Sequence, residues 1–345
     1  MKTPSRRMFL AAATAGALAA PEVVRAQARE LVMIGYGTAQ DDPIKRVGAE
    51  LARRHPGVSL RVIGGLSAEA LAQIKAARGA SPYDLAVMGT PAIINAVSED
   101  VLQPLDLKQV PSASKIDPKF MPYAQGMGVP VNYSGIGIAY SKQAVKEPPK
   151  VWADLWKPQF AGRVGISRPQ SNLGLGTVSI AARAFGRPDD DTDFGLAKWR
   201  ELKPLVGRSP PLLQQMLERG EIDLCVLWHD NTGIAASSGL PFGYVKATPG
   251  PIILPSSIVM FRRTGFSELI HEFAELFLAD EQQRFGTQPP YFFGPTVAGI
   301  PTPPSAAEYL PSTPEELASM TSVDWTTVAP KRGRVVEAFD RMFAA

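Results

Sequence analysis

The sequence predicts an α/β protein with two lobes, and three observations support this prediction. The chain of 345 residues is longer than a single hydrophobic core usually organises. Short runs rich in β-branched residues alternate with segments of helical periodicity, which is typical of a parallel sheet covered by helices. Two apolar regions, 126–140 and 249–260, lie where the chain would pass from one lobe to the other and back.

The first 28 residues are set apart because they have the pattern of an export signal. Arg6 and Arg7 precede an uncharged, alanine-rich run, and Ala26-Gln27-Ala28 provides the small side chains that a signal peptidase requires. Paired arginines before an apolar run are typical of the twin-arginine pathway. We expect cleavage after Ala28, a periplasmic location, and no part for residues 1–28 in the fold.

Charge and cysteine content narrow the function classes further. The predicted signal contains four basic residues and one acid, so the remaining chain has equal numbers of basic and acidic side chains. This balance gives no electrostatic reason to expect nucleic acid or an anionic membrane surface as a partner. Cys225 lies in the apolar run 222–227, so neither a disulfide within the chain nor a lipid anchor at the cleavage site is expected. We expect a soluble monomer.

The first lobe begins at residue 29 with a regular alternation of strands and helices. Asp42 and Pro43 suit a first helical turn, and Ile44, Val47 and Leu51 follow at helical spacing. Strands are predicted at 31–36, 58–63 and 84–88, and helices at 42–54, 67–77 and 91–97.

The second lobe is predicted to begin after Val131. Strands at 126–131 and 135–140, separated by Asn132-Tyr133-Ser134, would cross between the lobes. The chain would return at 249–260 and end with an amphipathic helix at 267–278 and a closing helix that contains Val335 and Phe339. Lobe 1 is therefore predicted to contain 29–131 and 256–345, and lobe 2 to contain 132–255. The intervening strands are expected at 163–167 and 222–227, with helices from 171 and at 194–202 and 211–219.

Several short segments follow the order and spacing of one protein family. They are Pro82 to Met88, Pro130 to Tyr140, Glu147 to Trp156, Gly220 to Asp223, Gly294 to Thr296 and Val323 to Trp325. Together they resemble the extracellular solute-binding proteins of ABC importers, in the group that includes polyamine, ferric-iron and thiamine binders. The resemblance implies a type II periplasmic-binding fold, in which a two-strand hinge joins the lobes around a ligand cleft. It also implies a small-molecule solute and a membrane permease as partners, and no cofactor.

Candidate ligand-binding residues follow from a rule for α/β sheets. Ligands bind beyond the carboxyl ends of the strands, so the residues that follow each predicted strand are the candidates. The aromatic side chain of Tyr291, in the proline-rich segment 289–304, is added to them as a possible wall of the cleft. The full set is Tyr36, Thr38, Gly89, Thr90, Tyr133, Ser134, Ser171, Asn172, Trp228, His229, Asp230, Asn231 and Tyr291.

Two segments carry most of the chemistry of this set. Trp228 to Asn231 offers an aromatic ring, an imidazole, a carboxylate and an amide, although Asp230 or Asn231 could simply cap a helix. Asp230 is the best partner for a cation, because an unpaired buried charge costs at least several kcal/mol. Ser171-Asn172 opens a helix whose N-terminus suits a carboxylate or a phosphate, or is only capped.

The preferred prediction is a binding protein for a small, amine-bearing solute of polyamine or thiamine type. An anionic or zwitterionic solute, or iron, is the alternative, as is a ligand sensor for a membrane receptor. Iron is disfavoured because the family's iron sites imply neighbouring tyrosines, which the segment 228–231 lacks.

Catalysis and metal binding are not expected. No two of His55, His229 and His271 have metal-ligand spacing, and no Gly-x-Ser-x-Gly or phosphate-binding loop occurs. His55 and His271 are predicted to lie on the surface. A secreted enzyme that uses His229 beside Asp230 would still need a nucleophile from elsewhere.

Overall fold

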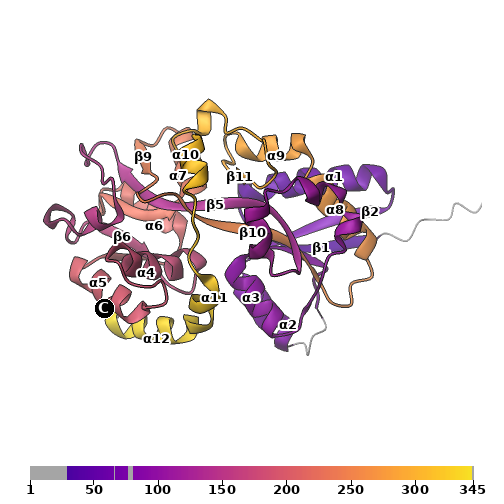
Figure 1. Cartoon of the computed structure of the whole chain (residues 1–345), viewed down its shortest axis with the longest axis horizontal. Coiled ribbons are helices and arrows are strands. Elements are labelled where there is room, and N and C mark those ends of the chain that lie inside the picture. Colours follow the sequence, from indigo (N-terminus) through magenta and orange to yellow (C-terminus); the bar gives the residue numbers. More distant parts are fainter. Residues whose placement is uncertain (1–28, 66, 77–80, 344–345) are drawn as a thin grey trace, which may run out of the picture.

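The computed structural model describes residues 29–65, 67–76 and 81–343. The predicted signal, with its arginine pair and cleavage site, lies outside the described residues. Within them, eleven strands form one mixed sheet in the order β2-β1-β3-β10-β5-β8-β6-β7, with β4, β9 and β11 paired at its side. Strands of this sheet lie in both lobes of the molecule (Figure 1). None of the helices in the described part of the chain has the length and apolarity that a membrane span requires.

Lobe 1 is built on parallel strands with helices between them. The apolar side chains of Ile44, Val47 and Leu51 are buried on α1, so the predicted helix at 42–54 is confirmed at both ends. These elements are β1 (Arg29–Gly35), α1 (Asp42–Arg54), β2 (Val58–Gly64), α2 (Ser67–Ala76), β3 (Leu85–Gly89), α3 (Thr90–Ser98) and β4 (Leu102–Gln103).

Two long antiparallel strands, β5 (Gly128–Ser141) and β10 (Ile252–Phe261), join the lobes. The prediction of two strands separated at Asn132-Tyr133-Ser134 is wrong. These three residues pair with Ser256, Pro255 and Leu254, so β5 continues through them. Polar side chains in the middle of the run suggested a break, but the backbone hydrogen bonds of a strand do not depend on side-chain polarity.

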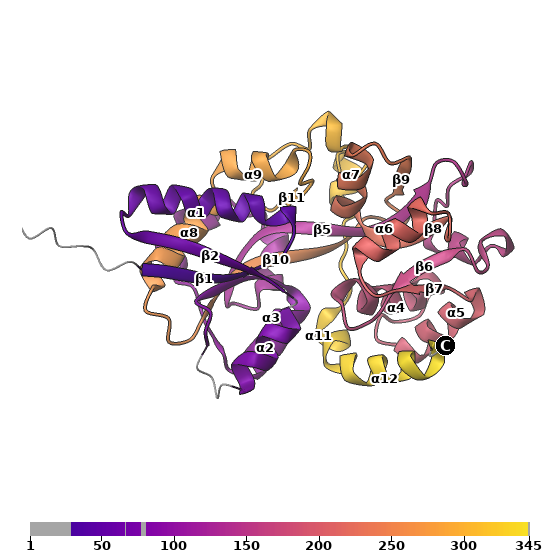
Figure 2. The ribbon, with the colours of Figure 1, turned by 180° about the vertical axis from the view of Figure 1, so that it is seen from behind.

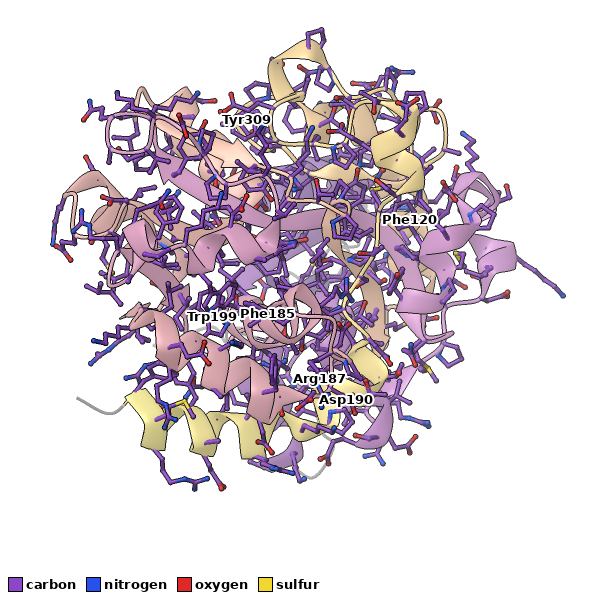
Figure 3. The ribbon with its side chains drawn as sticks, turned by 60° about the vertical axis from the view of Figure 1, so that its left-hand side comes forward. Phe120, Phe185, Arg187, Asp190, Trp199 and Tyr309 are labelled. Atoms are coloured by element: carbon purple, nitrogen blue, oxygen red, sulfur yellow. The ribbon has the colours of Figure 1, made fainter. Side chains whose placement is uncertain are left out.

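Lobe 2 repeats the alternation of strands and helices and contains a cluster of aromatic side chains, of which Trp199 is buried. Trp156 packs against Trp199 and Phe185, with ring centroids 4.7 and 5.1 Å apart. Figure 3 labels Trp199 and Phe185 in this lobe. The buried indole of Trp199 donates to the Thr177 carbonyl at 3.0 Å. The elements are β6 (Val164–Ser167), α4 (Asn172–Ala184), α5 (Thr192–Leu202), β7 (Leu205–Gly207), α6 (Pro210–Glu218), β8 (Leu224–Trp228), α7 (His229–Ser237) and β9 (Phe242–Val245).

The C-terminal part of the chain divides between the lobes. The sequence placed all of 256–345 in lobe 1, but Trp325, Val335 and Phe339 are buried in the core of lobe 2. The reason is that α12 packs its apolar residues against α5, which requires a third crossing after β11. Figure 2 shows the C-terminal helix α12 beside α5 of this lobe. The elements are α8 (Ser267–Phe277), α9 (Asp280–Thr287), β11 (Gly294–Pro295), α10 (Pro314–Ala318), α11 (Trp325–Val328) and α12 (Arg332–Phe343).

Short 3-10 helices make up several of the connections. One of them follows β5, at residues 152–156, and another precedes α12. Their bounds are Ala39–Asp41, Leu107–Gln109, Pro111–Lys115, Pro118–Ala124, Trp152–Trp156, Pro158–Phe160, Pro304–Ala306 and Ala329–Lys331.

The prediction of His271 on the surface is also wrong. This histidine is buried on α8, where its Nε2 accepts a hydrogen bond of 2.9 Å from the Asp106 backbone N–H. Its Nδ1 lies 2.7 Å from the Ser267 carbonyl oxygen. A hydrogen-bonded imidazole can occupy the apolar face of an amphipathic helix, which the pattern of residue types did not reveal.

Candidate functional site

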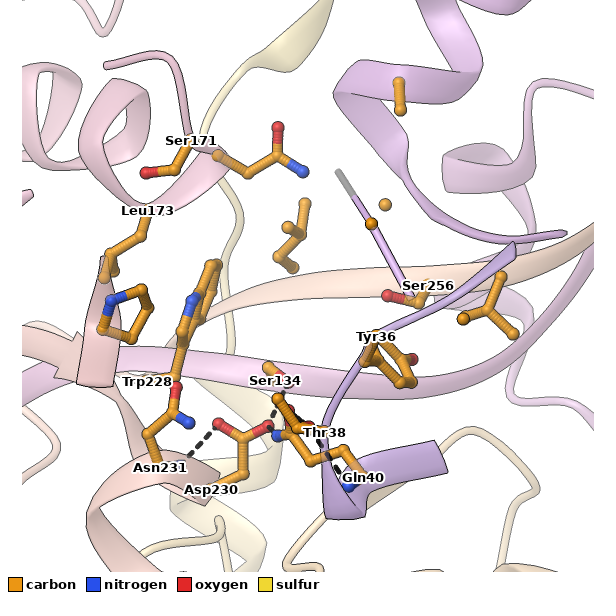
Figure 4. Close-up of a pocket in the computed structure, with 18 of the residues that line it drawn as sticks. Tyr36, Thr38, Gln40, Ser134, Ser171, Leu173, Trp228, Asp230, Asn231 and Ser256 are labelled. Carbon is orange, nitrogen blue, oxygen red and sulfur yellow. Dashed lines mark hydrogen bonds between the residues drawn. The ribbon is translucent and has the colours of Figure 1, made fainter. Parts of the chain in front are cut away.

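A pocket of about 330 Å³ lies between the two lobes (Figure 4). Tyr36 follows β1, Gly89 ends β3 and Trp228 ends β8, so the carboxyl ends of strands from both lobes meet there. Ser134 and Ser256 line the pocket from the crossing strands β5 and β10. The pocket therefore occupies the place that the strand-end rule predicts for a ligand.

Asp230, in the first turn of α7, supplies a buried carboxylate at one end of the pocket. Its Oδ2 accepts hydrogen bonds from Ser134 Oγ at 2.9 Å and from Gln40 Nε2 at 2.5 Å, and its Oδ1 accepts one from the Asn231 N–H at 2.9 Å (Figure 4). Burial raises the pKa of Asp230 to about 6, and these hydrogen bonds oppose the rise. The carboxylate is mostly ionised at neutral pH, and no Lys or Arg among the described residues forms an ion pair with it.

Arg332, at the start of α12, supplies a guanidinium to the same pocket. Its Nη2 donates to Asn172 Oδ1 at 2.7 Å, and its Nη1 donates to the Gln170 carbonyl at 2.8 Å. Its Nε is buried and has no hydrogen-bond partner. Burial lowers the pKa of Arg332, and within the described part of the chain no carboxylate is its ion-pair partner. The pocket thus contains a positive charge held by neutral acceptors.

Apolar side chains separate the two charged groups. Figure 4 shows Ser171 and Asp230 on opposite sides of the pocket, with Leu173 and Trp228 between them. The ring of Tyr36 packs against Phe293, with centroids 5.4 Å apart. The pocket can therefore hold a solute with polar ends and an apolar middle.

The lobes touch at both ends of the pocket. At one end, Gln40 of lobe 1 donates to Asp230 of lobe 2. At the other, Asn172 of lobe 2 approaches Gly89 of lobe 1 so closely that a Cβ at position 89 would lie 3.1 Å from Asn172 Nδ2. Glycine at position 89 thus leaves room for this close approach, and a larger side chain would require Asn172 and Leu254 to shift.

Most of the residues predicted from the sequence lie together at this pocket. The lining set includes Tyr36, Thr38, Gly89, Ser134, Ser171, Asn172, Trp228, Asp230 and Asn231. Four predicted residues, Thr90, Tyr133, His229 and Tyr291, lie outside it.

These four side chains have other surroundings. Thr90 is buried in the first turn of α3, and Tyr133 stacks on Phe120 in the core of lobe 1, with centroids 5.5 Å apart. Tyr291 packs against Phe285 at 5.0 Å. Burial or an aromatic neighbour accounts for each of these positions.

His229 joins α7 to two other parts of the chain. Its Nδ1 accepts from the Gly135 N–H at 2.5 Å, and its Nε2 lies 2.6 Å from the Phe292 carbonyl, to which the neutral ring donates. Burial lowers the pKa of His229 to about 4, which keeps the imidazole neutral at physiological pH. Successive residues of a helical turn point in different directions, so His229 faces β5 while Asp230 faces the pocket.

Several polar residues of the lining were not predicted from the sequence, namely Gln40, Asn95, Gln170, Ser256 and Arg332. Gln40 follows β1 by a few residues and could have been included by extending the strand-end rule through the next turn. Arg332 had no such signal, because it follows no strand and reaches the pocket only through the packing of α12. Among the described residues, no group of three or more His, Cys, Asp or Glu is placed to hold a metal ion.

Residues 47–311, more than half of the chain, match the family model of bacterial extracellular solute-binding proteins. The chain belongs to this family. This solute-binding protein is 24% identical over 213 residues to spermidine/putrescine-binding periplasmic protein 1 of Haemophilus influenzae. The match covers 58% of each chain, so it spans little more than half of that relative's length.

Solved structures show that the fold is that of periplasmic solute-binding proteins. An ABC transporter protein from Clostridium perfringens ATCC 13124 superposes with a TM-score of 0.74 at 21% identity, covering 90% of this chain and 99% of the other. A periplasmic binding protein from A. tumefaciens B6, solved in complex with glucopine, has a TM-score of 0.74 at 20% identity and covers 91% and 99%. The predicted periplasmic-binding fold is confirmed.

Proposed function

We propose that this solute-binding protein is the substrate-binding component of an ABC importer and captures a small, amine-bearing solute as its lobes close. The observation that carries the proposal is Asp230, a buried carboxylate that faces the pocket with no cationic partner among the described residues. The polyamine named for the Haemophilus influenzae relative is consistent with an amine.

Charge pairing gives the amine its affinity. A carboxylate removed from water costs several kcal/mol unless a cation and hydrogen bonds compensate it. An ammonium group would provide that cation, while Ser134 and Asn231 already satisfy part of the hydrogen bonding. The face of the Trp228 ring can add a cation–π contribution of about 0.5 to 2 kcal/mol.

Closure of the lobes couples capture to delivery. The hydrogen bond from Gln40 to Asp230 forms only when lobe 1 reaches lobe 2. A permease that recognises the closed form would then receive the loaded protein, which is the role that family membership favours.

A thermal-shift screen tests this function. We expect at least one of putrescine, spermidine, thiamine and amine-bearing amino-acid derivatives to raise the melting temperature, since a ligand at 100 times its Kd stabilises by about 2.7 kcal/mol. Asp230→Asn should abolish the shift, and Asp193→Asn, on the surface, should retain it. Turnover of a substrate without stabilisation by any solute would contradict the proposal.

Export to the periplasm by the twin-arginine pathway is part of the same proposal. It rests on the pattern around Arg6 and Arg7 and on the periplasmic relatives. Cell fractionation should find the natural chain in the periplasm and the doubly substituted Arg6→Lys, Arg7→Lys chain in the cytoplasm. Periplasmic accumulation of both chains would contradict the route. Size-exclusion chromatography of the exported protein should show a monomer.

A further inference from the structure

The two charges in the pocket have opposite signs. Asp230 is the one acidic residue, and Arg332 the one basic residue, among the described residues that line it. Neither of them has an ion-pair partner in the described part of the chain, and the two do not pair with each other. Each charge is therefore held only by neutral hydrogen-bonding groups.

The two charges lie at different ends of the pocket. Arg332 donates to Asn172, which is next to Ser171, and Figure 4 shows Ser171 on the side opposite Asp230. Leu173 and Trp228 lie between these ends. A ligand that reaches both charges must therefore be extended, with an apolar middle.

Helix α4 increases the positive potential at the Arg332 end. Its N-terminal residues Ser171, Asn172 and Leu173 line the pocket, and a helix N-terminus attracts negative charge. The Ser171 hydroxyl caps the Gly174 N–H at 3.0 Å, which fixes this turn beside the guanidinium. A guanidinium and a helix N-terminus together are suited to a carboxylate.

We propose that the solute is an ω-amino acid, whose ammonium group binds Asp230 and whose carboxylate binds Arg332. This proposal rests on the proposed function and specifies its solute class. A diamine of the same length fits less well, because its second ammonium would approach Arg332. The polar residues beside Arg332 at that end include Gln170, Ser171 and Asn172, which are all neutral.

Calorimetry with two probes that share a five-carbon chain tests the proposal. 5-Aminovalerate carries a carboxylate where cadaverine carries a second ammonium. We expect the natural protein to bind 5-aminovalerate roughly tenfold more tightly than cadaverine, or better, since like charges disfavour the wrong partner.

Variants of Arg332 then test whether this residue causes the preference for 5-aminovalerate over cadaverine. Arg332→Gln should weaken 5-aminovalerate binding by roughly tenfold or more, leave cadaverine binding unchanged or stronger, and so remove the preference. Arg332→Lys, which keeps the positive charge, should retain part of the preference for 5-aminovalerate. Arg334→Gln is the matched control, because Arg334 lies on the same helix but is exposed and paired with Asp193. Retained cadaverine binding shows that the Gln variant is folded.

The outcomes distinguish the ω-amino acid proposal from the proposed amine-binding function on which it rests. If cadaverine or spermidine binds as tightly as 5-aminovalerate, or if Arg332→Gln leaves the preference unchanged, the ω-amino acid proposal is overturned while the amine-binding function stands. If no amine of either class binds, both are overturned.

Discussion

At one end of the pocket, the Asp230 carboxylate is surrounded by donors: a hydroxyl, an amide and a backbone N–H. At the other end, the Arg332 guanidinium is surrounded by acceptors: a backbone carbonyl and an amide oxygen. In both arrangements, a charged group is hydrogen-bonded but has no oppositely charged partner among the described residues. They differ in how pH acts on them, since the carboxylate has a pKa of about 6 and a guanidinium keeps its proton across the physiological range.

The negative charge at the acidic end therefore depends on pH, whereas the positive charge at the basic end is present across the physiological pH range. Protonation near pH 6 removes the attraction of Asp230 for an ammonium, while Arg332 continues to attract an anion. Experiments that change one end and leave the other intact can separate the two contributions.

The largest expected effect comes from Asp230→Asn. Loss of the carboxylate should weaken binding of an amine-bearing solute by about 2 to 5 kcal/mol, the range for removing one partner of a buried charge pair. Calorimetry of the natural protein and the variant measures this change. An affinity that is unchanged would show that Asp230 only orders the first turn of α7.

The same substitution, although it weakens solute binding, should stabilise the ligand-free protein against unfolding. Because burial raises the pKa of Asp230 from 3.8 to about 6, its contribution to stability is complete below about pH 4 and is lost as pH rises through 6. Asp230→Asn should therefore raise the free energy of unfolding at pH 7 by up to about 3 kcal/mol.

Urea unfolding at several pH values measures this gain, which should shrink as pH falls towards 4. The comparison of variant with natural protein cancels the contribution of His229, whose lowered pKa of about 4 acts in the opposite direction. A variant less stable than the natural protein at pH 7 would contradict the expectation.

A smaller effect is expected from pH alone. Affinity for an amine should fall about tenfold between pH 7 and pH 5, since the ionised fraction of a group with a pKa of about 6 falls by that factor. Titrations with cadaverine across this range would measure the fall, and Asp230→Asn should remove it. Constant affinity would mean that another group carries the cation.

The smallest effect is expected from Gln40→Ala. The substitution removes one hydrogen bond between the lobes at the acidic end, which is worth about 0.5 to 1.5 kcal/mol. We expect a few-fold weaker binding by calorimetry and a faster release of solute in stopped-flow measurements. A loss as large as that of Asp230→Asn would mean that Gln40 contacts the solute itself.

The sequence was informative about the acidic end because its determinants are local. Asp230 follows an apolar run that could be predicted as a strand, and strand ends line the pockets of α/β proteins. The side-chain direction was not predictable, because His229 and Asp230 differ by one position on a helical turn. Only the packing of α7 against β5 decides which of them faces the pocket.

The basic end depends on contacts between residues far apart in the chain. Arg332 reaches Gln170 and Asn172 because Val335 and Phe339 bury their side chains in lobe 2. The apolar pattern predicted α12 as a helix but not the lobe on which it packs. For the same reason, the prediction from the sequence assigned all of the C-terminal residues to lobe 1.

The third crossing of the chain has a consequence for the kinetics of binding. It brings α12 to lobe 2, so Arg332 and Asp230 belong to the same lobe, and lobe 1 adds the neutral side chain of Gln40. A solute can thus engage both charges on lobe 2 while the lobes are apart. We expect the association rate constant of the solute to be independent of hinge motion. The dissociation rate constant should be set by how often the lobes reopen.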